Sequence, residues 1–184
     1  MVFFETPEAF EAWLDANGDG SDEVWIKMAK KRTGLASLDV RQAIEVALCF
    51  GWIDVQSKRV DDDWYVLRLT PRRPKSIWSK NNRQKVEALT AAGRMRPAGL
   101  AEVARAKSDG RWDAAYDGMA TASVPEDLAK ALDEAGLSDT FTALDSRNRY
   151  AVLHRIQTAK RPETRARRIA RYVSMLAAGD KLYP

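Results

Sequence analysis

The stretch WIDVQSKRVDDDWYVLRLT, residues 52–70, decides the fold of this chain. Apolar and polar residues alternate on both sides of three consecutive aspartates, a pattern typical of two strands joined by a turn. We therefore expect an antiparallel hairpin with Asp61–Asp63 as its loop. The register that follows places Val60 opposite Trp64, Lys58 opposite Val66, Gln56 opposite Arg68 and Asp54 opposite Thr70.

This register gives the hairpin one apolar face and one mixed face. The apolar face, expected to lie against the core, carries Ile53, Val55, Tyr65, Leu67 and Leu69. The mixed face carries Trp52, Asp54, Gln56, Lys58, Trp64, Arg68 and Thr70. Charged groups interleaved with tryptophan suit a binding surface better than a core. A slip of one residue in the register would exchange the two faces.

The segments before the hairpin predict a helix, a strand and a second helix. ETPEAFEAWLDANG, residues 5–18, has Thr6 as N-cap, Pro7 in the first turn and Gly18 past the end, which is typical of a helix. EVWIKMA, residues 23–29, alternates as a strand does. SLDVRQAIEVALCFG, residues 37–51, repeats apolar residues at helical spacing.

The segments after the hairpin predict helices only. Ser79 caps a helix that stops at Gly93, and Pro97 begins another that ends near Gly110. Beyond the connection at residues 116–123, four further segments have helical patterns. We expect an α+β fold, with a small, mainly antiparallel sheet and flanking helices followed by a helical C-terminal module. The predicted domains are residues 1–118, with a basic loop at 70–83, and residues 123–184, packed against the first.

Composition excludes several kinds of protein. Cys49 and His154 are the single residues of their types, which excludes a structural zinc site built from cysteines and histidines of one chain. We expect neither a metal nor a cofactor. The N-terminus lacks the pattern of a signal peptide, and no stretch approaches the roughly 20 apolar residues that span a bilayer. A cytoplasmic protein without membrane insertion is expected.

The charge is unevenly distributed along the chain. The formal net charge is +4, but residues 1–26 contain seven acids and no base, so the remaining residues carry a surplus of +11. Such a surplus favours a polyanionic partner. The alternative is that the acidic N-terminal part packs near the basic C-terminal part and neutralises it.

The first basic cluster, TPRRPKSIWSKNN at residues 70–82, contains no acid. Its prolines stiffen the loop, guanidinium forks match phosphate or carboxylate oxygens, and the helix that begins after Ser79 favours an anion. We predict a pocket for an anionic small molecule, with Trp78 and Trp52 stacking on the ligand or forming a wall. In the alternative, Trp78 fills core space, and the arginines are solvated or paired with Asp54 and Asp61.

The second basic cluster, AKRPETRARRIAR at residues 159–171, places Arg161, Arg165 and Arg168 on one helical stripe. Three interpretations remain open. The arginines could pair with the acidic N-terminal helix, contact the same anionic ligand, or contact a nucleic-acid backbone. The predicted ligand-binding residues of both clusters and of the hairpin are Trp52, Asp54, Lys58, Arg68, Arg72, Arg73, Lys75, Ser76, Trp78, Ser79, Asn82, Arg161, Arg165 and Arg168.

Several unusual words occur in one order along the chain. They are ALCFGWIDVQSKRVDDDWYVLRLTPRRPKSIWSKNN (47–82), GRMRPAGL (93–100), AKSDGRW (106–112) and AKRPETRARRIARYVSML (159–176). With them, residues 25–179 resemble the bacterial YdeI/OmpD-associated, or bacteriocin-protection, proteins. The stretch from about Val124 resembles the helical module that defines that family. The motif positions are Gly51, Trp52, Asp54, Pro71, Arg72, Ser76, Trp78, Ser79, Asn82, Lys160, Arg161, Thr164, Arg165 and Arg168.

The resemblance implies protection against bacteriocins or cationic antimicrobial peptides, and association with a porin as protein partner. It implies no reaction, cofactor or catalytic residue. Because a body of charge +11 repels cationic peptides, simple sequestration of such peptides is not expected.

Catalysis has little support in the sequence. We interpret Cys49 as a buried structural thiol, His154 as a capped or surface histidine, and Asp61–Asp63 as a solvated turn. We therefore expect a binding protein for an anionic ligand. The alternatives are an enzyme for a phosphorylated substrate, with Asp54 as acid or base, and a protein that binds single-stranded nucleic acid. The acidic start and the lack of a known motif argue against nucleic acid.

Overall fold

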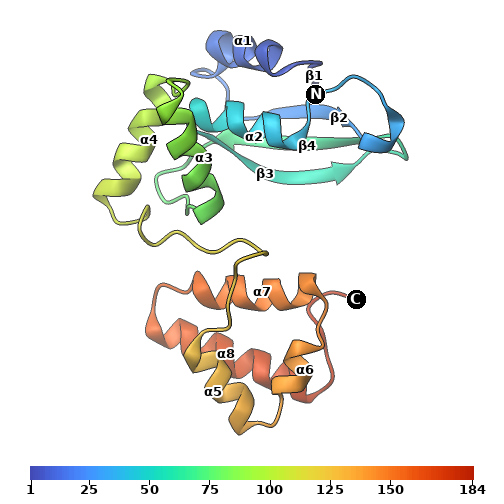
Figure 1. The fold of residues 1–184 in the computed structure, drawn as a ribbon, viewed down its shortest axis with the longest axis vertical. Helices are drawn as coiled ribbons and strands as arrows, with labels where there is room; N and C mark the ends of the chain where they lie inside the picture. Colours follow the sequence, from blue (N-terminus) through green and yellow to red (C-terminus); the bar gives the residue numbers. More distant parts are fainter. The chain divides into compact units, whose positions relative to one another are not determined.

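A computed structural model describes residues 1–184 and divides them into two compact units, Met1–Ala115 and Tyr116–Pro184. The first unit contains four strands, which form a sheet, and four α-helices, which lie outside the sheet (Figure 1). In chain order its elements are β1 (Val2–Phe3), α1 (Pro7–Asn17), β2 (Val24–Ala29), the 3₁₀ turn η1 (Lys31–Thr33), α2 (Val40–Cys49), β3 (Trp52–Arg59), β4 (Trp64–Pro71), α3 (Lys80–Ala91) and α4 (Pro97–Ser108).

The four strands form one sheet in the order β1-β2-β4-β3. Strand β4 pairs antiparallel with both β2 and β3, and the pairing with β3 is the hairpin that the sequence predicts. Strand β1 runs parallel to β2, so the sheet is mixed. The α+β fold class is confirmed, and the parallel edge strand is an addition to it.

Short side-chain caps explain where the helices begin. Thr6 accepts a hydrogen bond from the amide of Ala9 at 3.3 Å, and Pro7 occupies the first turn of α1. Asp39 and Gln42 form a reciprocal capping box at α2, and Ser79 caps α3 through the amide of Asn82. The predicted caps Thr6 and Ser79 are confirmed.

The hairpin β3–β4 has the predicted register near its turn and a different one at its far end. Lys58 lies opposite Val66 and Gln56 opposite Arg68, as expected. A β-bulge between Asp54 and Gln56 then shifts the pairing by one residue, so that Asp54 lies opposite Leu69 instead of Thr70. Because opposite residues share a face, the bulge moves Trp52 and Asp54 to the core face, and their predicted place on the mixed face is wrong.

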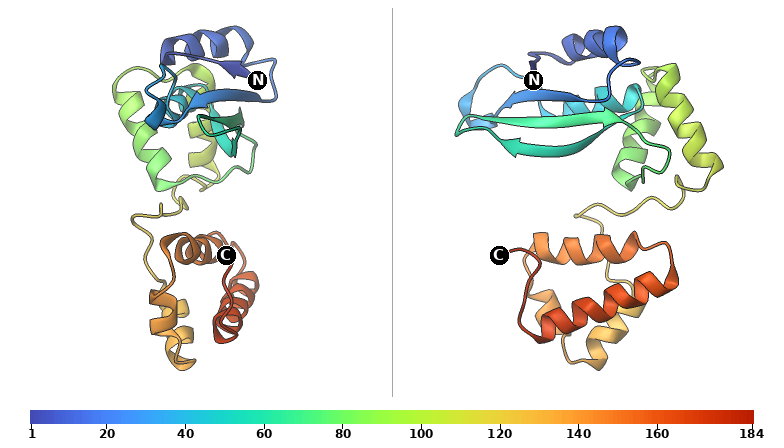
Figure 2. Two further views of the ribbon diagram at one scale, coloured as in Figure 1. Left: turned by 90° about the vertical axis from the view of Figure 1, so that its right-hand side faces the viewer. Right: turned by 180° about the vertical axis from the view of Figure 1, so that it is seen from behind.

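The first core lies between one sheet face and helices α1 and α2 (Figure 1). Phe10 and Leu14 of α1 and Val46 of α2 belong to one buried cluster with Ile26 and Leu67 of the sheet. None of the helices of the first unit covers the other face, onto which the right-hand view of Figure 2 looks. That face carries Trp25, Lys27, Lys58, Trp64 and Arg68, and we name it the open sheet face.

A second core joins α3 and α4 to the C-terminal end of α2. Trp78, Val86, Val103 and Trp112 belong to it. A Cβ atom at Gly99 would lie only 2.1 Å from the carbonyl oxygen of Cys49, so only glycine allows α4 to approach α2 this closely. Burial raises the pKa of the Cys49 thiol, in agreement with its interpretation as a structural residue.

The second unit is entirely helical, with α5 (Glu126–Glu134), α6 (Ser138–Thr142), α7 (Ser146–Gln157) and α8 (Pro162–Ala177). The four predicted helices are confirmed. Leu128, Val152, Ile156 and Tyr172 lie in its core. The C-terminal segment returns to α7 (Figures 1 and 2), where buried Asn148 accepts from the amide of Tyr183 at 2.9 Å and donates to its carbonyl oxygen at 3.1 Å.

Candidate functional site

Arg72 is a buried residue of the basic loop, and its contacts fix the loop to Trp78 and to the backbone. This side chain is 5% exposed, and its Cζ atom lies 3.5 Å from the centroid of the Trp78 ring. Its Nη1 atom donates to the carbonyl oxygen of Ile77 at 3.2 Å. Trp78 itself is 2% exposed and packs in the second core, with one ring face covered by Arg72. The Arg72–Trp78 stack therefore serves the loop as a scaffold.

Arg111 provides a second anchor that the sequence analysis missed. Its Nη1 atom donates to the carbonyl oxygen of Ser76 at 2.7 Å, and its Nε atom contacts the carboxylate of Asp109 at 2.7 Å. The ring of the next residue, Trp112, meets Trp78 edge to face at 5.0 Å between centroids. Arg111 and Trp112 both belong to the motif AKSDGRW, residues 106–112. The sequence did not indicate their contact with the loop, because they lie about 35 residues after it.

Arg73 and Lys75 are the cations that this scaffold presents outward, since both side chains are exposed. The two predicted hydroxyls are already used as acceptors within the loop. Ser76 Oγ accepts from the amide of Arg73 at 3.0 Å, and Ser79 Oγ accepts from the amide of Asn82 at 3.1 Å. A ligand of this loop would therefore meet Arg73 and Lys75 first.

Trp52 and Asp54 lie on the opposite side of the hairpin from the other predicted residues of the mixed face. Trp52 is 3% exposed and meets Trp13 of α1 edge to face at 6.4 Å between centroids. Its side chain fills the first core, because the bulge turns it inward.

Lys58 and Arg68 belong to the open sheet face. Lys58 Nζ lies 4.9 Å, and Arg68 Cζ 5.8 Å, from the centroid of the Trp25 ring. Lys27 Nζ lies 4.2 Å from the centroid of the Trp64 ring. Arg68 Nε donates to the carboxylate of Glu23 at 2.6 Å, and this ion pair lowers the pKa of Glu23. This face combines indole rings with ammonium groups.

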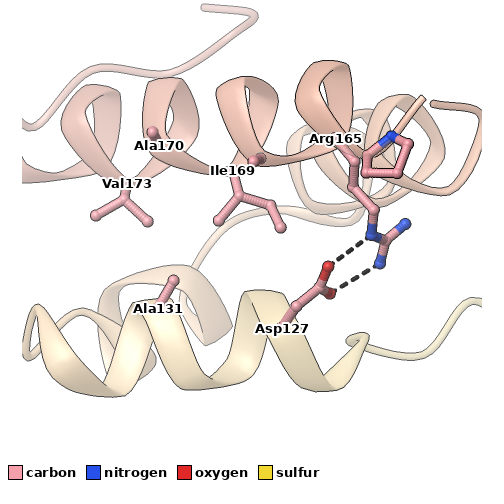
Figure 3. A pocket seen from close by; sticks show the side chains of 8 residues that line it. Asp127, Ala131, Arg165, Ile169, Ala170 and Val173 are labelled. Carbon is pink, nitrogen blue, oxygen red and sulfur yellow. Dashed lines mark hydrogen bonds and ion pairs between the residues drawn. The ribbon is translucent and has the colours of Figure 1, made fainter.

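Two arginines of the predicted stripe, Arg165 and Arg168 of α8, have side-chain contacts within the second unit, and Arg161 lies exposed before the helix. Arg165 forms a bidentate ion pair with Asp127 of α5, at 2.6 and 2.8 Å, which lowers the pKa of that carboxyl (Figure 3). Arg168 Nη1 donates to the carbonyl oxygen of Arg155. Arg165 is thus paired within its own unit. In the first unit, Glu11 and Asp15 of α1 pair with Arg96, at 2.8 and 3.3 Å.

Beside the Arg165–Asp127 pair, α5 and α8 leave an apolar groove of about 450 Å³ (Figure 3). Ala131 of α5 faces Ile169 and Val173 of α8 across it, and the ion pair lies at one end.

A second hollow of the same unit lies between α7, α8 and the C-terminal segment. It has a volume of about 450 Å³, and its lining includes Arg147, Tyr150, His154, Arg155, Arg168 and Tyr183. We name it the arginine hollow. Of these residues only Arg168 was predicted as part of a site, because the hollow joins segments that are far apart in sequence.

His154 lies in an aromatic setting at this hollow. Its ring meets Tyr116 at 4.6 Å and Tyr150 at 5.8 Å between centroids. Burial lowers the pKa of His154, and the charges of Arg155 and Arg168 lower it further. These surroundings therefore favour the neutral imidazole.

Comparison with protein families accounts for both units. Residues 2–102 match the family model described as a domain of unknown function (DUF8412), which covers more than half of the chain. The chain belongs to this DUF8412 family. Residues 121–179 match the model described as Bacteriocin-protection, YdeI or OmpD-Associated, which confirms the resemblance for the second unit of this DUF8412 protein. No curated protein and no solved structure matches the chain.

No helix of this DUF8412 protein is both long enough and apolar enough to cross a bilayer.

Proposed function

We propose that the protein is a noncatalytic binding protein of the YdeI/OmpD-associated type that holds a phosphate- or carboxylate-bearing ligand at the basic loop. The observation that carries the proposal is the pair of exposed cations, Arg73 and Lys75, on a loop without any acid between residues 70 and 82. The Arg72–Trp78 stack and the bond from Arg111 to Ser76 fix the loop before a ligand arrives.

A fixed loop favours binding because less conformational entropy is lost when the ligand is bound. Arg73 can offer two parallel N–H donors to one phosphate or carboxylate group, and Lys75 adds a compact positive charge. Such an arrangement orients an oxyanion but provides no general base, which is why we favour binding over turnover.

Protection against bacteriocins would follow from this ligand rather than from capture of a cationic peptide. The +11 surplus beyond residue 26 opposes a cationic partner. Any association with a porin would, in the same proposal, be a separate protein contact.

A thermal-shift screen of nucleotides, sugar phosphates and cell-envelope precursors tests the proposal. We expect a stabilising compound whose effect is lost in the Arg73→Gln/Lys75→Gln double variant. The Lys31→Gln variant is the control, because it removes one exposed positive charge elsewhere in the same unit. Equal stabilisation of the double variant, or turnover of the compound, would contradict a noncatalytic loop site.

The open sheet face favours a second candidate function, the binding of single-stranded nucleic acid. Its indole rings and cations are the elements with which single-strand binders stack bases and contact phosphates. Binding to a mixed oligonucleotide should then weaken steeply with salt, and Trp64→Ala should weaken it at every salt concentration. A flat salt dependence would rule out backbone contacts.

A further inference from the structure

The arginine hollow concentrates positive charge without any acid in its lining. Arg147, Arg155 and Arg168 line it, and none of them forms an ion pair, in contrast to Arg165 on the same helix as Arg168. Guanidinium groups gathered around one cavity repel one another, and a bound anion would reduce this repulsion.

Neutral contacts hold these arginines in place. Arg155 Nη2 donates to the hydroxyl of Tyr183 at 3.2 Å, and Arg147 Cζ lies 4.1 Å from the centroid of the same ring. Arg168 donates to the backbone carbonyl of Arg155. The side chains are therefore oriented while their charge stays uncompensated, which is the arrangement expected of a preorganised anion site.

His154 adds a group that can respond to an anion. The charged and titratable groups around it are Arg155 and Arg168, with the rings of Tyr116 and Tyr150. The negative charge of Asp117 contributes to the raised pKa of Tyr150. The Asp117 carboxylate accepts a hydrogen bond from Gln157 Nε2 at 2.7 Å. A bound dianion would favour the imidazolium form, and His154 would then add a charged donor.

We propose that the arginine hollow is a binding site for a phosphate monoester of a small molecule, with Arg147, Arg155 and Arg168 around the phosphate and the rings of Tyr150 and Tyr183 beside the rest of the ligand. Its volume of about 450 Å³ lies within the usual range for small-molecule sites. This site belongs to the second unit and is independent of the proposed loop site.

The single histidine makes the test direct, because only His154 can give a histidine signal in the NMR spectrum of the full chain. The titration of this signal is followed with inorganic phosphate, with glucose 6-phosphate, and with chloride at equal ionic strength. We expect phosphate and its ester to move the titration of His154 to higher pH, and the ester to bind more tightly. An unchanged titration would overturn the proposal.

Matched variants separate a built site from general charge. Arg147→Gln should weaken binding of glucose 6-phosphate about tenfold, since one charge-assisted contact is lost. Arg171→Gln removes the same charge from an exposed position of α8 and should leave binding unchanged. Equal weakening by both variants would show a nonspecific charge effect and overturn the proposal.

Two further arms identify the source of the phosphate and keep the two sites apart. Vesicles containing phosphatidic acid would bind the chain through Arg147 if the group came from a lipid, whereas binding of soluble glucose 6-phosphate alone indicates a free metabolite. The Arg73→Gln/Lys75→Gln variant should retain the full response of His154. A negative result for ligand binding at the loop would therefore not contradict the hollow as a site, and a negative result at the hollow would not contradict the loop.

Discussion

The basic loop and the arginine hollow are both rich in arginine, but they use it in opposite ways. In the loop, the cations lie close together in sequence, and the most buried of them, Arg72, stacks on Trp78 as part of the scaffold. In the hollow, the arginines come from α7 and α8, and none of the three has a carboxylate partner. A dense run of charges in a sequence therefore locates only some of the cations that are available to an anion in the fold.

The largest effect should follow the loss of the loop scaffold. Trp78→Ala should lower the free energy of unfolding of the first unit by about 3–5 kcal/mol, because it removes a buried aromatic ring and the surface on which Arg72 stacks. All six tryptophans lie within residues 1–115, so tryptophan fluorescence in a urea titration follows this unit. Trp64→Ala, on the open sheet face, is the control and should cost less.

A smaller effect is expected where the C-terminal segment meets α7. Asn148→Ala should destabilise the second unit by about 1–3 kcal/mol, because the backbone groups of Tyr183 lose their buried partner. The signal of His154 during a urea titration reports this unit. The same variant should reduce the response of His154 to phosphate, since Tyr183 orients Arg155. An unchanged response of His154 in this variant would show that the position of Tyr183 does not affect phosphate binding.

The ion pair that distinguishes Arg165 from Arg168 should contribute less. A double-mutant cycle of Arg165→Gln and Asp127→Asn should give a coupling of about 0.5–1 kcal/mol, because both side chains are partly exposed. The folded state lowers the pKa of Asp127, so this stabilisation is present above the unfolded value of about 4 and is lost as the pH falls through the folded value. Cycles measured at pH 6 and pH 2 should therefore differ, the coupling disappearing in acid.

The smallest effect concerns the titration of His154 without ligand. Its folded pKa lies below the ordinary value of about 6.5, so the unfolded chain binds more protons and stability decreases as the pH falls from 6.5 towards the folded value. Arg168→Gln should raise the pKa of His154 by removing a nearby positive charge, and Arg171→Gln should not. An NMR titration of the three proteins compares these values. Equal values would mean that Arg168 does not face the imidazole.

Local sequence signals predicted most of the fold. Thr6, Pro7 and Ser79 marked helix starts because capping depends on residues within one turn. Alternation and the three aspartates predicted the hairpin and its register next to the turn. Strand β1 escaped prediction because two residues are too few to show a period.

Contacts between distant segments were not predictable in the same way. Nothing near Arg165 in the sequence indicates that its partner is Asp127, 38 residues away. The approach of Tyr183 to Arg155 depends on where the chain returns after α8. The loop residues Arg73 and Lys75 were predicted because they belong to one short basic segment, whereas the hollow exists only once the helices are packed. The sites at both places stay proposals for the experiments above.

The β-bulge at Val55 has a consequence for how this hairpin can vary. Removing that one residue would make the pairing regular and would keep Trp52 opposite Pro71, on the core face, whereas removing Ile53 would place Trp52 opposite Thr70 and turn the indole out of the interior. The number of residues before the bulge thus decides which hairpin residue meets α1, so a one-residue deletion should be tolerated at Val55 and should be disruptive at Ile53.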